Sequence, residues 1–477
     1  MKPIYAGFVI AAFAFATHLC ADPPSSIAIK DAHVVTVSGS DLPKATVLVK
    51  DGLIRDVGPD IAIPADAWVI DGAGLTVYPG FIDGLSTWGI PQPASANTGA
   101  RTGASPNTAP QPAQPASPPI PETEQVSAAQ ALARGPESRP QTYSFERAAD
   151  LVSPTDTRLQ AARAAGFSSA ATFPNRGIFE GLGAMVDFAG DGGRDMVVAQ
   201  PIGQQVVFRV GSGGMGRSFP SSLMGNISYV RQLYLDLDQY KQAKQIYAAN
   251  PSGVHRPEYD HTLEGLAESP RILLPADQAQ QIDRMLNFAP ELKTPFVLYG
   301  MHEAFLRIDE LKKADVPVLI SLKWPEKPRD ADPADIPNMR DLELREKAPA
   351  APGMLAKAGV KFAFFSDGVD TAPDLKKAVK KAIDAGLSRP EAIRALTLSA
   401  AEIYGVSDRL GSIDKGKIAN LVVTKGDAFD EKTTIEYLFI DGQQFRPSRE
   451  AQQGPANGQR GQRPNPTETV ISDGGLQ

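Results

Sequence analysis

Cysteine is almost absent from this sequence, since Cys20 is the only one among 477 residues. A single cysteine excludes any disulfide within the chain, so the fold has to be stabilised by its core. Positive charge is also in deficit: 48 Lys and Arg stand against 55 Asp and Glu, for a net charge of -7. Nothing here provides the basic surface that nucleic acid requires, so we expect no nucleic-acid partner.

A hydrophobic run long enough to cross a bilayer as a helix, about 20 residues, is missing as well. The apolar run from Ile4 to Ala16 follows Lys2 and ends in small residues, a pattern typical of a secretory signal peptide. We therefore predict a signal peptide over 1–21, export to the periplasm or medium, and a mature protein without an integral membrane segment. A lipid anchor on Cys20 is the less favoured alternative, because the residues before it resemble the lipoprotein cleavage motif poorly.

Two segments have little apolar character and are predicted to be disordered. The first is an insertion over 91–140, rich in Pro, Ala, Thr and Gly, and the second is the tail over 447–477. Neither can bury enough apolar surface to order itself. A Pro-rich ligand for another protein is the alternative for the insertion.

Short alternating segments occupy both ends of the remaining chain, over 27–78 and 405–446. Asp51-Gly52 and Asp441-Gly442 each interrupt two apolar runs, which is a strong local signal for a tight hairpin turn. Together the two ends predict one small β-sandwich domain built from the N- and C-terminal segments.

The middle of the chain, 79–404, alternates short apolar strands with amphipathic helices, which favours parallel α/β architecture. We predict a (β/α)8 TIM-like barrel, in which chemistry lies at the carboxyl ends of the strands. The strands are expected in the segments SSAATF, AMVDFAG, RILLPA, PFVLYG, PVLIS and FAFFSD.

Four segments between Ile27 and Phe445 carry a resemblance to the amidohydrolase superfamily: VLVKDGLIRDVG, VIDGAGLTVYPGFID, AGVKFAFFSDG and RPEAIRALTLSAAEIYGVSDRLGSIDKGKIANLVV. The resemblance implies a metal-dependent hydrolase barrel joined to a composite β-sandwich. It also implies hydrolysis of a carbon–nitrogen bond other than a linear peptide bond, in a small amide, a cyclic amide, an N-acyl amino acid or a dipeptide-like molecule. The partner would be this small molecule, and a homo-oligomer is compatible with the pattern.

Histidine is scarce, with five in the chain, and it is missing where the family places its first metal ligands. The family pattern puts His-X-His two positions beyond the Asp of Pro-Gly-Phe-Ile-Asp, because residues i and i+2 of a strand face the same side. Leu85 and Thr87 stand at these positions. Leucine cannot bind a metal, and a neutral hydroxyl is a poor substitute for imidazole.

Two further family positions keep polar residues. His302 follows the sixth barrel strand, and Asp367 matches the last family acid, which moves protons during catalysis. With Asp277 after the fifth strand, beside Pro275, they could form a reduced site for a divalent metal, zinc foremost. The alternative is that Asp277 caps the following helix and His302 is an ordinary polar residue. Without a metal, which lowers the pKa of bound water from about 15.7 to about 7, a carboxylate is a poor base for water.

A glycine-rich loop supplies a motif of another class: Gly211, Gly213, Gly214 and Gly216 follow a strand, and Asp236 stands where a ribose-binding acid would. Phe219 and Pro220 separate these glycines from the helix, and Asp236 falls in a helical run, so dinucleotide binding is disfavoured. The loop could instead hold an anionic part of a ligand through free backbone N–H groups.

Two functions remain open from the sequence. The first is an exported hydrolase with a degenerate metal site, in which Asp367 is the catalytic residue. The second is a catalytically inactive amidohydrolase-like protein that serves in binding or as an accessory protein in the periplasm.

Overall fold

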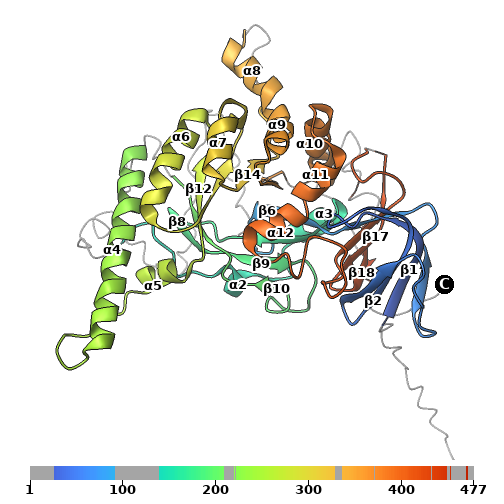
Figure 1. Ribbon diagram of the computed structural model, residues 1–477, viewed down its shortest axis with the longest axis horizontal. Helices are drawn as coiled ribbons and strands as arrows, with labels where there is room; N and C mark the ends of the chain where they lie inside the picture. Colours follow the sequence, from blue (N-terminus) through green and yellow to red (C-terminus); the bar gives the residue numbers. More distant parts are fainter. Residues whose placement is uncertain are drawn as a thin grey trace, which may run out of the picture.

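The computed structural model describes residues 26–91, 139–208, 220, 222–327, 336–369, 371–430, 432–447, 452 and 469–470. The predicted signal peptide, Cys20, nearly all of the Pro-rich insertion and the four glycines of the predicted ligand loop lie outside these residues. In Figure 1 a sheet formed by the two ends of the chain lies at one side of the molecule, and the long helix α4 (Leu223–Ala249) lies at the other.

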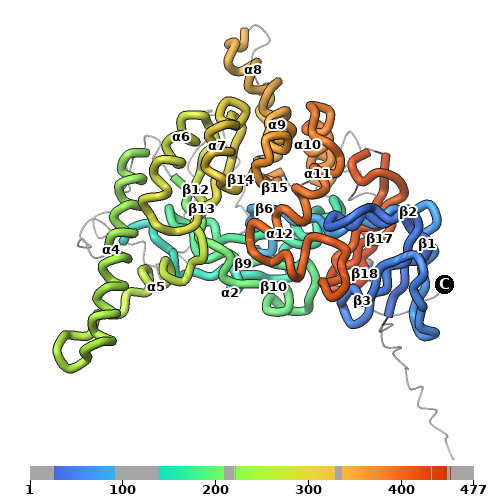
Figure 2. The backbone as a smooth tube through the Cα atoms, viewed as in Figure 1, coloured from blue at the N-terminus to red at the C-terminus, as the bar shows by residue number. Residues whose placement is uncertain are grey.

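Strands from both ends of the chain form one nine-stranded sheet. Its order is β19-β18-β17-β16-β5-β1-β2-β3, and β4 also pairs with β1. Figure 2 shows the blue strands β1 to β3 and the red strands β17 and β18 in the same part of the molecule. The two ends thus meet in one β unit, while the facing layers of a sandwich stay a prediction. The strands are β1 (Ser26–Val34), β2 (Leu42–Lys50), β3 (Leu53–Gly58), β4 (Trp68–Asp71), β5 (Thr76–Pro79), β16 (Leu421–Thr424), β17 (Ile435–Ile440), β18 (Gln443–Arg446) and β19 (Thr469–Val470).

Both hairpins predicted from Asp-Gly pairs are confirmed in this sheet. Asp51 and Gly52 join β2 to β3 with φ of 52° and 75°, and Asp441 and Gly442 join β17 to β18 with φ of 52° and 73°. Two consecutive positive φ angles define the type I′ turn, whose twist matches that of the flanking strands.

The middle of the chain forms two more sheets, of four strands in the order β10-β9-β7-β6 and of six strands in the order β15-β14-β13-β12-β11-β8. All six strand segments predicted from the sequence are confirmed, as β7, β9 and β12 to β15. The strands are β6 (Phe81–Ser86), β7 (Phe167–Thr172), β8 (Phe179–Leu182), β9 (Ala184–Asp187), β10 (Val197–Ala199), β11 (Gln204–Val206), β12 (Ile272–Ala276), β13 (Phe296–Gly300), β14 (Val318–Ser321) and β15 (Phe362–Phe365).

The expectation of a regular, closed (β/α)8 barrel is not met by the described residues. The fold is mixed α/β, but no ladder joins β6 to β15, and β8, β9 and β10 make antiparallel pairs. The two sheets meet through side chains instead: the carboxylate of Asp83 on β6 accepts a hydrogen bond from the backbone N–H of Ser366, just after β15. Gly84 permits this approach, since a Cβ there would lie 2.8 Å from the carbonyl oxygen of Phe364.

One apolar cluster fills the space between the two sheets. It takes Leu85 from β6, Phe173 from the end of β7, Leu273 from β12, Leu319 from β14 and Phe365 from β15. The opposite faces of the same strands pack on the helices, so these strands are buried on both sides. Burial on both sides explains why they read as continuous apolar runs in the sequence.

Helices cover the outer faces of the strands, and α6, α7, α9 and α10 lie along one side of the molecule in Figure 1. Several begin at polar caps; Ser222, for example, accepts a hydrogen bond from the N–H of Gly225. No helix among the described residues is both long enough and apolar enough to cross a membrane. Besides α4, the helices are α2 (Ala148–Leu151), α3 (Arg158–Ala164), α5 (His261–Glu268), α6 (Ala279–Phe288), α7 (Ile308–Ala314), α8 (Met339–Lys347), α9 (Ala351–Ala358), α10 (Ala372–Asp384), α11 (Arg389–Ala395) and α12 (Leu398–Tyr404), with 3-10 turns at η1 (Ala289–Leu292), η2 (Ala304–Leu306) and η3 (Ala348–Ala350).

The tail predicted to be disordered has ordered contacts where it is described. The side-chain amide of Gln452 is buried and bonds both the N–H and the C=O of Ile435. The two residues of β19 pair with β18. Disorder of the tail as a whole stays a prediction, because most of 447–477 lies outside the described residues.

Candidate functional site

The parallel strands β12 to β15 run side by side, so the residues that follow them gather at one edge. Asp277 follows β12, His302 follows β13, Ser321 ends β14 and Asp367 follows β15. This edge is the carboxyl end at which the sequence places the chemistry.

Asp277 and His302 form the strongest contact at this edge. The Nδ1 atom of His302 lies 2.6 Å from Oδ1 of Asp277, and the same oxygen accepts the backbone N–H of His302 at 3.1 Å. Burial alone would raise the pKa of Asp277, but the hydrogen bond and charge of His302 outweigh it and lower that pKa. Burial alone would lower the pKa of His302, but the hydrogen bond and charge of Asp277, with the charge of Asp367, raise it. Each side chain of the pair thus favours the charged form of the other.

Asp277 does not cap the neighbouring helix, so that alternative is wrong. Helix α6 has its N-cap at Gln278, and the side chain of Gln281 accepts the backbone N–H groups of Asp277 and Gln278. The carboxylate of Asp277 is thereby left for His302. His302 is more than an ordinary polar residue, since its Nε2 atom is buried and has no hydrogen-bond partner among the described residues.

Asp367 is exposed to solvent. It accepts a hydrogen bond from the hydroxyl of Ser321 at 2.8 Å, and that hydroxyl in turn accepts the N–H of Lys323 at 3.1 Å. The backbone of Asp367 has φ of +49°, in the left-handed region that non-glycine residues enter rarely. Such conformations are concentrated at functional sites, where the surrounding structure holds them in place.

Asp83 braces β6 against the end of β15. Its side chain is fully buried, Oδ1 accepts the N–H of Ser366 at 2.9 Å and that of Leu85 at 3.4 Å, and Oδ2 has no partner in the described part of the chain. Burial raises the pKa of Asp83 to about 7, although its hydrogen bonds act the other way. A carboxyl that is half protonated near neutrality suits a buried brace better than a metal ligand.

Leu85 and Thr87 stand where the resembled family has histidine, and both make other contacts. Leu85 is 7% exposed and packs in the apolar cluster between the sheets. The hydroxyl of Thr87 accepts a hydrogen bond from Nη1 of Arg158 at 2.8 Å, and its carbonyl oxygen accepts one from Nη2 at 2.7 Å.

These contacts decide whether the residues fit the metal that the family resemblance implies. Zinc takes three or four nitrogen, sulfur or oxygen ligands around one point. In the described residues no group of three or more His, Cys, Asp and Glu side chains could hold a metal ion. Asp277, His302 and Asp367 therefore do not form the predicted three-ligand site in this arrangement, and the positions of Leu85 and Thr87 add nothing to it. Metal binding itself stays a prediction.

The predicted ligand loop cannot be compared with this site. Gly211, Gly213, Gly214 and Gly216 lie outside the described residues, so their predicted role in ligand binding stays untested. Asp236 lies on α4 and binds Arg139 at 2.6 Å as well as Gln232 at 2.7 Å. It has a structural role there, and the structure gives no support for reading it as a ribose-binding acid.

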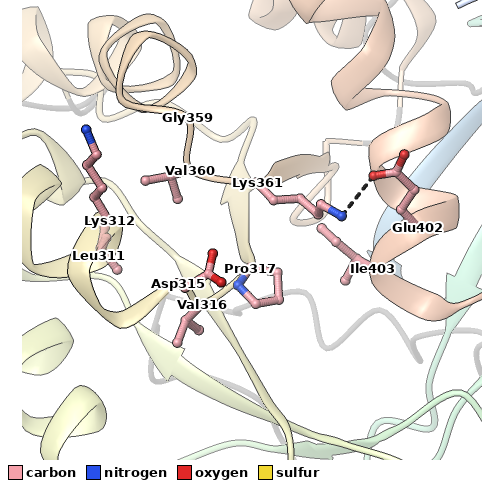
Figure 3. A pocket seen from close by; sticks show the side chains of 10 residues that line it. All are labelled: Leu311, Lys312, Asp315, Val316, Pro317, Gly359, Val360, Lys361, Glu402 and Ile403. Atoms are coloured by element: carbon pink, nitrogen blue, oxygen red, sulfur yellow. Dashed lines mark ion pairs between the residues drawn. The ribbon is translucent and has the colours of Figure 1, made fainter. Parts of the chain in front are cut away.

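A cavity of about 260 Å³ lies at the opposite end of the strands. Figure 3 shows it between Pro317, which precedes β14, and Lys361, which precedes β15, with Lys312 on one side and the ion pair of Lys361 with Glu402 on the other. Because these residues precede the strands, this cavity is separate from the edge that carries Asp367.

The comparisons with known proteins agree with the fold. Residues 301–445 match the family model described as the amidohydrolase family. The solved structure of an amidohydrolase from Thermotoga maritima MSB8 superposes with a TM-score of 0.65, at 24% identity, over 87% of this chain and 98% of that chain. The resemblance to the amidohydrolase superfamily is thereby confirmed.

Curated relatives match only a short piece. The dihydroorotases of Mycobacterium tuberculosis (strain ATCC 25618 / H37Rv) and Mycobacterium bovis (strain ATCC BAA-935 / AF2122/97) are each 52% identical over 40 residues. That piece is 8% of this chain and 9% of the length of the relatives.

Sequence reasoning missed three residues of this region: Ser321, Arg158 and Asp156. Asp156 accepts a hydrogen bond from Nη2 of Arg158 at 2.7 Å. Ser321 ends a predicted strand, so its place beside Asp367 could have been read from the parallel order. Arg158 contacts Thr87 across 71 positions of the chain, and no local pattern indicates that contact.

Proposed function

We propose that this chain is a hydrolase of the amidohydrolase family that cleaves a carbon–nitrogen bond, other than a linear peptide bond, in a small amide or cyclic amide. Its metal site would be degenerate, and residues 1–21 would direct its export. The observation that supports this best is the group of His302, Asp277, Ser321 and Asp367 at the carboxyl ends of adjacent strands. Three of these four lie within the segment that matches the family model.

In this proposal Asp367 is the catalytic residue. Its carboxylate is exposed and oriented by the hydroxyl of Ser321, so it can take a proton from an attacking water and return it to the leaving nitrogen. His302 lies close enough to Asp367 for the charge of that carboxylate to act on it, and a protonated His302, only partly offset by Asp277, would favour the negative charge that develops on a tetrahedral intermediate. His302 acts as a positioning residue, because Asp277 holds both its ring and its backbone N–H.

A specific observation favours the second function, a catalytically inactive binding or accessory protein. Leu85 and Thr87 are used for packing and for Arg158, so the first half of the family's ligand set is replaced by structural contacts. A carboxylate without a metal is a weak base for water, which limits the rate that the first function can reach.

Two measurements separate these functions. The mature protein is incubated with an N-acyl amino acid, a cyclic amide and a dipeptide, and release of the amine or ring opening is followed by mass spectrometry. Its metal content is measured by elemental analysis. Turnover that disappears in Asp367→Asn supports the hydrolase, whereas binding of one of these compounds without turnover supports the second function. Stoichiometric zinc, manganese or iron that persists after loss of both Asp367 and His302 would contradict the site assignment.

A further inference from the structure

The segment that follows β6, residues 87–90, is held by an unusually complete set of hydrogen bonds. The N–H of Gly89 donates to Oδ2 of Asp156 at 2.9 Å, and the carbonyl oxygen of Gly89 accepts the N–H of Ser153 at 2.7 Å. The carbonyl oxygen of Trp88 accepts the hydroxyl of Thr172 at 2.7 Å. This is the segment that begins where the family places its second metal-binding histidine.

Arg158 lies at the centre of these contacts. Its guanidinium donates to Oγ1 of Thr87 at 2.8 Å, to the carbonyl oxygen of Thr87 at 2.7 Å and to that of Ile90 at 2.7 Å. It also binds both carboxylate oxygens of Asp156, with Nε at 3.0 and 3.1 Å and Nη2 at 2.7 Å. One cation is therefore surrounded by five oxygen atoms, three of them from the segment after β6.

The anchor of this cation is buried. The side chain of Asp156 is 4% exposed and that of Arg158 is 22% exposed, so the pair is largely removed from water. Breaking a largely buried pair from one side costs more than breaking a surface pair, because the remaining charge loses its partner. The two residues stand at the start of α3, which fixes the cation relative to the second strand, β7.

We propose that Arg158, anchored by Asp156, does the positioning that a metal ion does in the resembled family. It holds residues 87–90 beside the carboxyl ends of β12 to β15, and we call this edge the mouth. The mouth then forms without a metal ion. Arg158 is a positioning residue in this scheme and takes no part in chemistry. The proposal concerns how the site is assembled, and it holds for a hydrolase and for a binding protein alike.

The chemistry of arginine explains why this residue suits the role. A guanidinium is planar, always charged, and presents five N–H donors in fixed directions, whereas an ammonium has three donors around one atom. Lysine at position 158 could keep the charge near Asp156, but it could not reach the carboxylate and all three oxygens of the segment together. A methionine would keep most of the volume and lose every contact.

The test uses the full mature chain and two variants, Arg158→Met and Arg158→Lys, with Arg147→Met as the matched control. Arg147 also donates to a carboxylate, Glu268 at 2.6 Å, but both side chains are more than a third exposed and neither touches the segment after β6. The first readout is the fluorescence of Trp88, which is 4% exposed and packs against Phe167 and Phe188. A Trp88→Phe background identifies its share of the signal among the three tryptophans.

We expect Arg158→Met to shift the Trp88 emission to longer wavelength and to lower the melting temperature, Arg158→Lys to recover part of both, and Arg147→Met to change neither. The melting temperature of the wild-type chain should be the same with and without a chelator. An unchanged Trp88 emission in Arg158→Met would overturn the proposal, and so would a wild-type melting temperature that falls on chelation and returns with zinc. Neither readout depends on hydrolysis, so failure here is distinguishable from failure of the proposed function.

Discussion

The two halves of the mouth carry different kinds of side chain. After β6, the positions of Leu85 and Thr87 are taken by apolar packing and by the guanidinium of Arg158. After β12 to β15, an imidazole, two carboxylates and a hydroxyl remain at the strand ends. The segment that matches the family model begins at residue 301, on the polar side of this division. The polar groups at the ends of β12 to β15 thus occur together with an apolar and a hydroxyl side chain at positions 85 and 87.

Removing the carboxylate of Asp367 tests the polar half of the mouth most directly. In Asp367→Asn we expect turnover to fall about 100-fold or more, because general acid–base catalysis contributes about 10² to 10⁴. Asparagine tolerates the left-handed backbone and keeps an acceptor for Ser321, so the fold should persist. Rates on the hydrolysed amide, together with circular dichroism, check this.

Asp441→Asn is the matched control for that variant. Asp441 also has a positive φ, of 52°, but it lies in the hairpin turn between β17 and β18. Its turnover should equal that of the wild type. An equal loss in both variants would mean that the backbone conformation, and not the acid of the mouth, limits the rate.

On the apolar side, Leu85→His tests whether the missing ligand can be restored. A buried imidazole without a partner costs about 1–3 kcal/mol, and the side chain has no second ligand at position 87. We expect lower stability in urea and no gain of zinc by elemental analysis. Leu85→Met, which keeps volume and polarity, should cost less than about 1.5 kcal/mol. Stoichiometric zinc in Leu85→His would show that the apolar half has kept the geometry of a metal site.

The pair of His302 and Asp277 predicts a pH dependence. The raised pKa of His302 gives a contribution to stability that is complete below its unfolded value, about 6.5, and is lost as pH rises through the folded value. The lowered pKa of Asp277 gives one that is complete above its unfolded value, about 3.9, and is lost as pH falls through the folded value. The pair should therefore stabilise the fold most between these limits.

Asp277→Asn should consequently lower the melting temperature more at about pH 5.5 than at about pH 9. The comparison is made against the wild type at each pH, so that groups elsewhere cancel. A difference that is the same at both values would mean that the two side chains contribute through packing and not through charge.

The smallest effect is expected away from both halves. Arg147 and Glu268 form an exposed pair, and exposed pairs contribute little because water and salt screen them. Arg147→Met should leave turnover and the melting temperature unchanged within error. A large loss there would indicate that the α2 region communicates with the mouth in a way that the hydrogen bonds do not suggest.

Much of this arrangement could be predicted from the sequence. Strands buried on both faces have to be apolar throughout, so β12 to β15 stand out as short runs between polar loops. Leu85 and Thr87 were located by counting from Asp83 along the pattern of the resembled family, in which residues i and i+2 of a strand share a face. His302 and Asp367 were located by matching the same family pattern at the ends of later strands.

The rest depends on contacts between distant segments. The hydrogen bonds from Arg158 to Thr87 span 71 positions, and nothing in either neighbourhood selects the other. The contact that bridges β6 and β15 is of the same kind, since Asp83 accepts the N–H of Ser366 across 283 positions. A regular barrel was expected because strand counting cannot detect an antiparallel pair such as β7 with β9.

The pairing of β5 with β16 has a consequence for synthesis. Tyr78 lies opposite Val422, so the partner of an early strand leaves the ribosome more than 300 residues later. Until then β5 presents an unpaired edge that can recruit other chains. A nascent or truncated polypeptide that stops before residue 421 should therefore be prone to aggregate, and its rescue would fall to factors that shield open strands.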